Sequence, residues 1–117
     1  MQKDDLVYAG HMLDLARSAL GKLKGKTRQE YDEDENLRLA LVHLLQNIGE
    51  AARRVSSVLR SEHPEIPWTS IVGLRHRVVH DYLQVNFGIV WDVVLNDLAP
   101  LIAQLEVFVP EADTQTE

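Results

Sequence analysis

Apolar residues recur at steps of three and four positions along almost the whole chain, and this period constrains the fold more than any other feature. It predicts one helix from about residue 4 to 23, a second from about 34 to 59, a third from about 68 to 80, and a fourth from about 86 to 108. No segment has a convincing strand pattern. We therefore expect an all-α fold, an antiparallel up-and-down bundle of four to five helices.

Side chains that cap helices stand at several of the expected helix ends. Asp34 and Asn86 are suitable N-caps for the second and fourth helices, because a short oxygen-bearing side chain can accept a free backbone N–H. Thr27 and Glu30 have the spacing of a capping box, which predicts a short turn of helix between the first two helices.

Proline and glycine predict where helices are interrupted. Pro100 should kink or split the last helix after Asp97, because proline lacks the N–H that a helix interior needs. Pro67 suits the first turn of the third helix. Gly49, inside the second helix, costs about 1 kcal/mol relative to alanine. It marks either the close approach of another helix or a glycine that the helix tolerates.

The size and composition of the chain indicate one soluble domain. Its 117 residues fit a single domain, residues 1–117, whose polar tail from 110 to 117 is expected to fray. The absence of cysteine excludes a disulfide framework and thiolate metal sites. The first residues are polar, and no apolar run approaches the length of a membrane span. A cytoplasmic location is the expectation.

A formal net charge of −6 makes the chain a poor general binder of nucleic acid, because nonspecific affinity comes mostly from neutralising phosphates. An RNA or nucleotide ligand would therefore need a local positive pocket. The basic residues that could form it are Arg75, His76, Arg77 and His80, joined by Arg53 and Arg54.

Residues 75–82 carry the densest chemistry of the chain, with two arginines, two histidines, an aspartate and a tyrosine around two valines. A guanidinium is a permanently charged fork for phosphate or carboxylate. An imidazole exchanges a proton near neutral pH. A tyrosine hydroxyl is a potential nucleophile or point of modification. The plainer interpretation is a solvated helix end, where basic side chains complement the helix dipole.

The spacing of these residues makes a geometric demand. Arg75 and His80 would lie about 140° apart around a regular helix. Both can reach one ligand only if the helix ends or distorts near His80, or if a second subunit brings its copy close. His76 and His80 do share a helix face, but nothing specifies Asp81 or Glu50 as further zinc ligands, and no metal site is expected.

Three other features have ordinary structural interpretations. The acidic run 31–35 is expected to face solvent. Trp68 and Trp91 stand in apolar surroundings, which favours packing in the core or at an interface. The three histidines outside the cluster are expected to be surface or hydrogen-bonded helix residues rather than ligands.

The cluster resembles the R-x4-H-x-Y motif of HepT-like proteins in the HEPN superfamily. Arg75, His80 and Tyr82 stand at its three fixed positions, and His76 stands where close relatives usually have asparagine. The flanking segments also follow the family pattern, so the resemblance covers about residues 34–105. These segments are Ile48–Ala52, Ile66–Trp68 before Ile71–Arg75, and Ile89–Asp92 before Asn96–Leu98.

The resemblance implies an all-α homodimer in which the arginine and histidine of both subunits line one cleft. It implies a toxin of a type II toxin–antitoxin pair, with metal-independent endoribonuclease activity and no cofactor. Arg75 and His80 would be catalytic, with His76 and Arg77 helping to hold the RNA backbone. The implied partner is a minimal nucleotidyltransferase antitoxin, which would transfer AMP to Tyr82.

A second hypothesis of a different class stays open at this point. The chain could be a non-catalytic subunit whose cleft binds a nucleotide or docks the nucleotidyltransferase. The net charge of −6 favours this alternative, whereas the pairing of Arg75 with His80 favours the enzyme.

Overall fold

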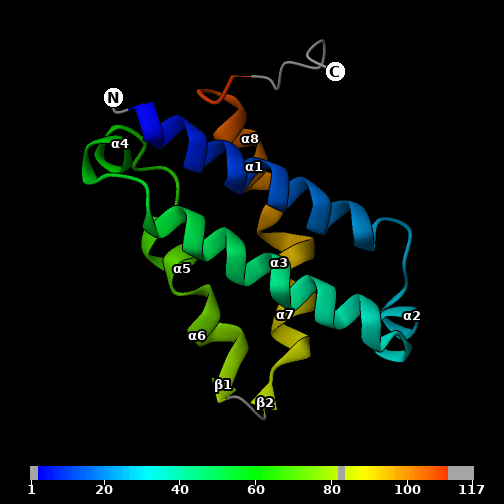
Figure 1. The fold of residues 1–117 in the computed structure, drawn as a ribbon. Helices are drawn as coiled ribbons and strands as arrows, with labels where there is room; N and C mark the ends of the chain where they lie inside the picture. The colour runs from blue at the N-terminus through cyan, green and yellow to red at the C-terminus, as the bar shows by residue number, and fades with distance from the viewer. Residues whose placement is uncertain (1–2, 82–83, 111–117) are drawn as a thin grey trace.

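The computed structural model describes residues 3–81 and 84–110, and all of its large elements are helices (Figure 1). Helix α1 (Lys3–Leu23) runs antiparallel to helix α3 (Glu35–Arg53), and the short helix α2 (Arg28–Glu33) connects them. The expected frayed tail falls mostly on residues 111–117, which lie outside the described residues.

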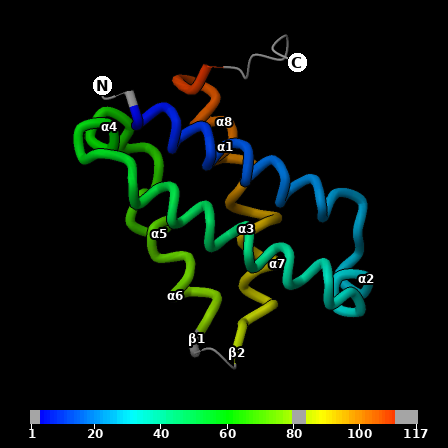
Figure 2. Tube along the Cα trace, in the orientation of Figure 1, coloured from blue at the N-terminus to red at the C-terminus, as the bar shows by residue number. Residues whose placement is uncertain are grey.

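The second half of the chain packs against these two long helices. Helices α5 (Trp68–Val72) and α6 (Leu74–Val78) contact α3, whereas α7 (Phe87–Asn96) and α8 (Leu98–Glu106) contact α1. Helix α7 also contacts α3 and α6, and the hydrogen bond from the N–H of Asn86 to the carbonyl of Val78 places its N-terminal end beside the end of α6 (Figure 2).

The core is continuous between these helices and is almost entirely apolar. Its fully buried large side chains include Met12, Leu23, Leu41, Leu45, Ile48, Leu59, Ile66, Leu98 and Leu105. The expected all-α class is confirmed. None of the described helices is by itself long and apolar enough to cross a membrane, and only the bent pair of α7 and α8 reaches that length and composition together.

The local capping predictions are confirmed. Asp34 accepts a hydrogen bond from the N–H of Leu37 at 3.0 Å, and Asn86 accepts one from the N–H of Ile89 at 3.0 Å. Thr27 and Glu30 form both bonds of the capping box that starts α2. These caps form because each needs only a side chain and a backbone group within three positions.

The break at Pro100 is also confirmed, because α7 ends at Asn96 and α8 begins at Leu98 with an angle of 42° between them. The glycine in α3 marks a close helix contact, as one of its two interpretations required. A Cβ atom on Gly49 would lie 2.9 Å from the carbonyl oxygen of Ile71 in α5.

The prediction of one helix from 34 to 59 was wrong at its C-terminal end. Helix α3 ends at Arg53, and a separate helix α4 spans Ser57–Glu62. The break has a physical cause in α1, where the buried carboxylate of Asp5 accepts hydrogen bonds from the N–H of Ser56 at 2.8 Å and from its hydroxyl at 2.6 Å. The Ser56 oxygen in turn accepts the N–H of Leu59, which caps α4.

The third helix also differs from its prediction, because it divides at Gly73 and ends at Val78. The chain then forms strand β1 (Val79–Asp81), which pairs antiparallel with strand β2 (Gln84–Val85). The N–H of Asn86 donates to the carbonyl of Val78 at 2.7 Å and closes this hairpin. Consecutive β-branched valines favour extended backbone, which the helical period alone did not reveal.

The interpretation of the acidic run holds for its four acids but was wrong for its tyrosine. Residues 32–35 are exposed, whereas Tyr31 is fully buried and packs against Trp91, with ring centroids 5.0 Å apart. Trp68 is buried, and its indole N–H donates to the carbonyl of His63 at 3.0 Å. Both tryptophans therefore pack as expected, Trp91 being half-buried.

Candidate functional site

Helix α6 presents the basic motif residues to solvent while anchoring itself in the core. Leu74 and Val78, four positions apart, are buried. Arg75, His76 and Arg77, between them, are exposed. Helix α6 thus holds itself in the core through two apolar residues and exposes the three cationic or titratable residues between them.

The end of α6 at Val78 meets one condition for bringing Arg75 and His80 together. A continued helix would turn these two residues to different sides, but the backbone is extended at Val79–Asp81. Strand β1, which contains His80, lies at one end of the molecule (Figures 1 and 2). Tyr82 and the side chains of His80 and Asp81 lie outside the described residues.

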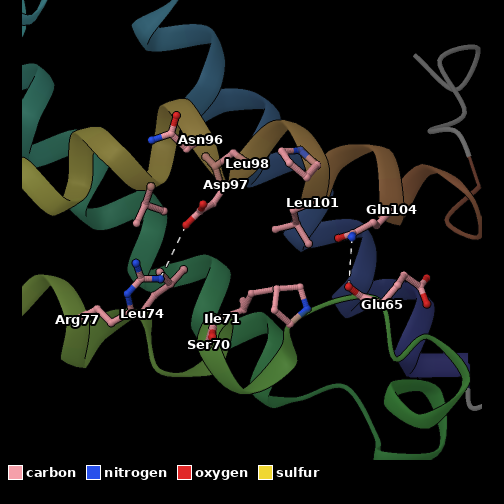
Figure 3. Close-up of a pocket in the computed structure, with 13 residues that line it drawn as sticks. Glu65, Ser70, Ile71, Leu74, Arg77, Asn96, Asp97, Leu98, Leu101 and Gln104 are labelled. Atoms are coloured by element: carbon pink, nitrogen blue, oxygen red, sulfur yellow. Dashed lines mark hydrogen bonds and ion pairs between the residues drawn. The ribbon is translucent and has the colours of Figure 1, made fainter.

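Arg77 stands at the edge of a groove between α5–α6 and α7–α8 (Figure 3). Its guanidinium Nη1 lies 3.9 Å from Oδ2 of Asp97 on the opposite wall, and both side chains are about half exposed. The groove has a volume of about 260 Å³. Its lining residues are Glu65, Pro67, Ser70, Ile71, Leu74, Arg77, Val93, Asn96, Asp97, Leu98, Pro100, Leu101 and Gln104.

A hydrogen bond crosses the groove at its other end. The amide of Gln104 donates to the backbone carbonyl of Glu65 at 3.2 Å. Between this bond and the Arg77–Asp97 pair, the lining is mostly aliphatic. The arrangement can bind a small, flat, largely apolar group next to a cation.

Arg53 and Arg54 are not brought into this groove. Both form ion pairs with Glu50, at 2.9 Å and 3.6 Å, and the hydrogen bond from Arg53 holds the pKa of the Glu50 carboxyl below its usual value. Arg54 lines a separate hollow between α1 and α3, where its guanidinium lies over the ring of Tyr8. Both charges are therefore paired with Glu50, and neither arginine lines the groove beside Arg77.

The groove itself was missed by sequence reasoning. Its walls come from four helices, and its apolar residues fit the same helical period as the core. Asp97 was noted in the sequence as the point of a helix break and as part of a segment that follows the family pattern, but not as a site residue. Among the residues that the structure describes, no three His, Asp or Glu side chains are grouped as a metal ion would require.

The fold and the motif together define a class of small helical domains in which an Arg-x4-His-x-Tyr segment leaves a helix for a hairpin. The HepT-like family model, described as "Ribonuclease HepT-like", matches residues 12–108, and the chain belongs to this family. The resemblance indicated by the motif is thereby confirmed.

Curated relatives span the chain at moderate identity. The chain is 30% identical over 99 residues to a protein of Caldanaerobacter subterraneus named "Putative RNase", covering 85% of this chain and 88% of that protein. It is 24% identical over 116 residues to a "Putative RNase" of Methanocaldococcus jannaschii, covering 99% and 96%. It is 30% identical over 73 residues to the "Probable ribonuclease HepT" of Thermococcus cleftensis, covering 62% and 66%. No solved structure matches the chain significantly.

Proposed function

We propose that the protein is a metal-independent endoribonuclease whose catalytic residues are Arg75 and His80. The family description and the ribonuclease names of its relatives support the reaction class. The observation that carries the residue assignment is the end of α6 at Val78, because it removes the helical geometry that would keep the two side chains apart.

The substrate supplies the nucleophile in this reaction. The 2′-oxygen of a ribose attacks the adjacent phosphorus, the bond to the 5′-oxygen of the next nucleotide breaks, and a 2′,3′-cyclic phosphate and a 5′-hydroxyl result. His80 acts as general base or general acid, which typically contributes about 10²–10⁴-fold. Arg75 stabilises the negative charge that builds up on the phosphorane-like transition state.

Two copies of the chain share one catalytic cleft in this proposal. The reaction needs a base for the 2′-hydroxyl and an acid for the leaving oxygen, and one imidazole cannot hold both protonation states at once. A homodimer supplies the two forms from two His80 side chains. His76 and Arg77, exposed beside Arg75, help to hold the RNA backbone.

Regulation would act on the same motif as part of a toxin–antitoxin pair. A minimal nucleotidyltransferase antitoxin transfers AMP from a nucleoside triphosphate to the hydroxyl oxygen of Tyr82, and pyrophosphate leaves. The added phosphate places a negative charge two residues from His80, where it competes with the RNA and offsets the positive charge of the cleft.

Substitution of the two catalytic residues tests the reaction. His80→Ala and Arg75→Ala should each lower the rate of cleavage of a labelled RNA by at least about 100-fold, with unchanged helical circular dichroism. His11→Ala and Arg17→Ala, in exposed residues of α1, are the matched controls and should retain the activity. Full cleavage by the His80→Ala protein would refute the catalytic assignment.

The modification is tested by intact mass after co-expression with a minimal nucleotidyltransferase. The wild-type chain should gain mass in AMP increments on the peptide that contains Tyr82, and Tyr82→Phe should gain none. Tyr8→Phe serves as the control for loss of an unrelated tyrosine. AMP incorporation that persists in the Tyr82→Phe protein would place the acceptor elsewhere.

The second candidate is a non-catalytic subunit that binds a nucleotide or docks the nucleotidyltransferase. The aliphatic groove beside Arg77 and the net charge of −6 favour it. Nucleotide binding by a protein that cleaves no RNA, with equal affinity in the wild type and the His80→Ala variant, would select this candidate over the enzyme.

A further inference from the structure

We propose that the groove between α5–α6 and α7–α8 binds one nucleobase of the RNA, and that Asp97 makes this subsite prefer guanine. The inference rests on the proposed ribonuclease function, since it assigns the base next to the phosphate that Arg75 would hold. Its test reads out base recognition separately from cleavage.

The position of the groove connects it with the motif. Arg77 lines the groove and lies two residues after Arg75 in the same helix, which is about 200° around a regular helix, so the two side chains leave different sides of α6. Helix α6 is short, so an RNA strand that passes around it can place a phosphate at Arg75 and a nearby base in the groove. Figure 3 shows Arg77 at one end of the groove, pointing toward the opposite wall.

The facing walls of the groove suit the two faces of a base. They are formed by aliphatic side chains that are themselves mostly buried, so the surface is rigid as well as apolar. These are Ile71, Leu74, Leu98 and Leu101, each 6% exposed or less. Single-stranded RNA is commonly read by placing an unstacked base against apolar, aromatic or guanidinium surfaces, and the Arg77 guanidinium supplies a further planar surface here.

Asp97 supplies the hydrogen-bond acceptors at the edge of this surface. Its backbone is held in the α7–α8 bend, where its N–H donates to Val93 at 2.9 Å and its carbonyl accepts from Leu101 at 3.3 Å. Its side chain makes no capping hydrogen bond to α8, although aspartate at this position commonly does. The carboxylate instead faces Arg77 at 3.9 Å, a distance that leaves its oxygens able to accept hydrogen bonds.

A carboxylate that accepts two parallel hydrogen bonds matches guanine best among the four bases. Guanine presents the adjacent N1–H and exocyclic amine on its Watson–Crick edge, whereas cytosine and adenine present one amine and uracil one imide N–H. The Arg77 side chain remains available for the base face or a phosphate. A well-aligned bidentate contact of this kind discriminates by about tenfold or more.

The occupancy of the groove is measured by nuclear magnetic resonance of methyl groups in the His80→Ala protein, which leaves the RNA intact. Short oligoribonucleotides that differ at one base are added to saturation. The guanine-containing RNA should shift the methyl signals of Ile71, Leu74 and Leu101. The methyls of Val7 and Val58, exposed on α1 and α4, should stay in place.

The role of Asp97 is measured by fluorescence anisotropy with the same RNAs. Binding should favour the guanine RNA by about tenfold, and Asp97→Asn should abolish most of this preference. Glu106→Gln is the matched control, because Glu106 forms a comparably exposed ion pair with Arg17 outside the groove. It should leave the preference unchanged.

The outcomes separate the subsite from the ribonuclease. The base subsite would be refuted if the methyl signals of Ile71, Leu74 and Leu101 did not respond to saturating RNA, or if the base preference survived Asp97→Asn. This holds even if His80→Ala stops cleavage. The subsite would also be refuted if a second copy of the chain already covered these methyl groups and RNA left their signals unchanged. Cleavage retained by His80→Ala, together with guanine-dependent shifts, would leave the subsite standing and remove the proposed catalytic residue.

Discussion

At the scale of single residues, Tyr31 ties together segments that are 56 positions apart in the chain. It is fully buried, and its hydroxyl donates to the carbonyl of Phe87 at 2.7 Å. Burial raises the pKa of this phenol to about 12, although the charges of Arg28 and Arg38 act in the opposite direction. Since Phe87 is the first residue of α7, the bond fixes the helix that follows the hairpin.

The raised pKa gives a pH-dependent prediction. The folded state keeps Tyr31 protonated, so its contribution to stability is complete below pH 10 and is lost as the pH rises through about 12. Tyr31→Phe leaves the Phe87 carbonyl unpaired and should cost about 1 kcal/mol of unfolding free energy at neutral pH. Denaturant unfolding should show the gap between wild type and variant closing from pH 10 to 12. A gap that stays constant over this range would contradict the assignment.

Residues of the site could be predicted from the sequence only where they are close together in the chain. Arg75, His76 and Arg77 stand out because they are adjacent, and the structure leaves all three exposed. Tyr31 was hidden by the acids that follow it. The place of Asp97 opposite Arg77 could not be predicted locally, because it depends on how α6 and α7 pack.

At the scale of helices and strands, the contact between α3 and α5 depends on a residue without a side chain. The backbone carbonyl of Ile71 approaches α3 so closely that a Cβ on Gly49 would lie 2.9 Å from it. Carbonyls of Ile71 and Val72 both face this glycine, so the last turn of α5 and the start of α6 rest directly on α3. The placement of the basic motif residues thus depends on this contact.

Gly49→Ala should therefore destabilise the protein despite the better helix propensity of alanine, which is worth about 1 kcal/mol. We expect a net loss of about 1–3 kcal/mol in unfolding free energy, because α5 must move away from α3. Gly21→Ala in α1 is the control, since nothing lies within 4 Å of its added Cβ. It should be neutral or stabilising in the same denaturant titration. Equal unfolding free energies for the two variants would show that α5 can move away from α3 without loss of stability.

Helix ends were predicted correctly where the interactions that form them are local in sequence, and incorrectly where those interactions are distant in sequence. The caps at Thr27, Asp34 and Asn86 were predictable because capping acts within three positions. The break before Ser56 was not, because its cause is a hydrogen-bonding carboxylate 51 positions away at Asp5. The hairpin escaped prediction for a similar reason, since a strand of two or three residues has too few positions to show alternation.

At the scale of the whole molecule, the proposed mechanism needs two chains. One described chain exposes a single set of Arg75, His76 and Arg77, and the acid and the base of the reaction are proposed to come from two copies. The net charge of −6 on each copy opposes association, so the proposed dimer would need apolar or complementary contacts to hold it together.

Sedimentation velocity should give a mass of twice 13.3 kDa at concentrations where the enzyme is active. The specific rate of RNA cleavage should fall on dilution in parallel with the fraction of dimer, because a lone chain lacks half of the proposed cleft. A strictly monomeric protein with full specific activity would contradict the shared cleft while leaving Arg75 and His80 as candidates.

The 42° bend between α7 and α8 has a consequence for how this molecule can vary. Helix α8 packs mainly against the long helix α1, whereas α7 runs from the hairpin to the bend. A change in the angle therefore moves the two helices relative to each other. The bend also carries Asp97 on the wall opposite Arg77. Substitutions in the core beneath α8 can therefore widen or narrow the distance between these walls. If the groove is the base subsite proposed above, such substitutions would change its base preference without contacting the RNA.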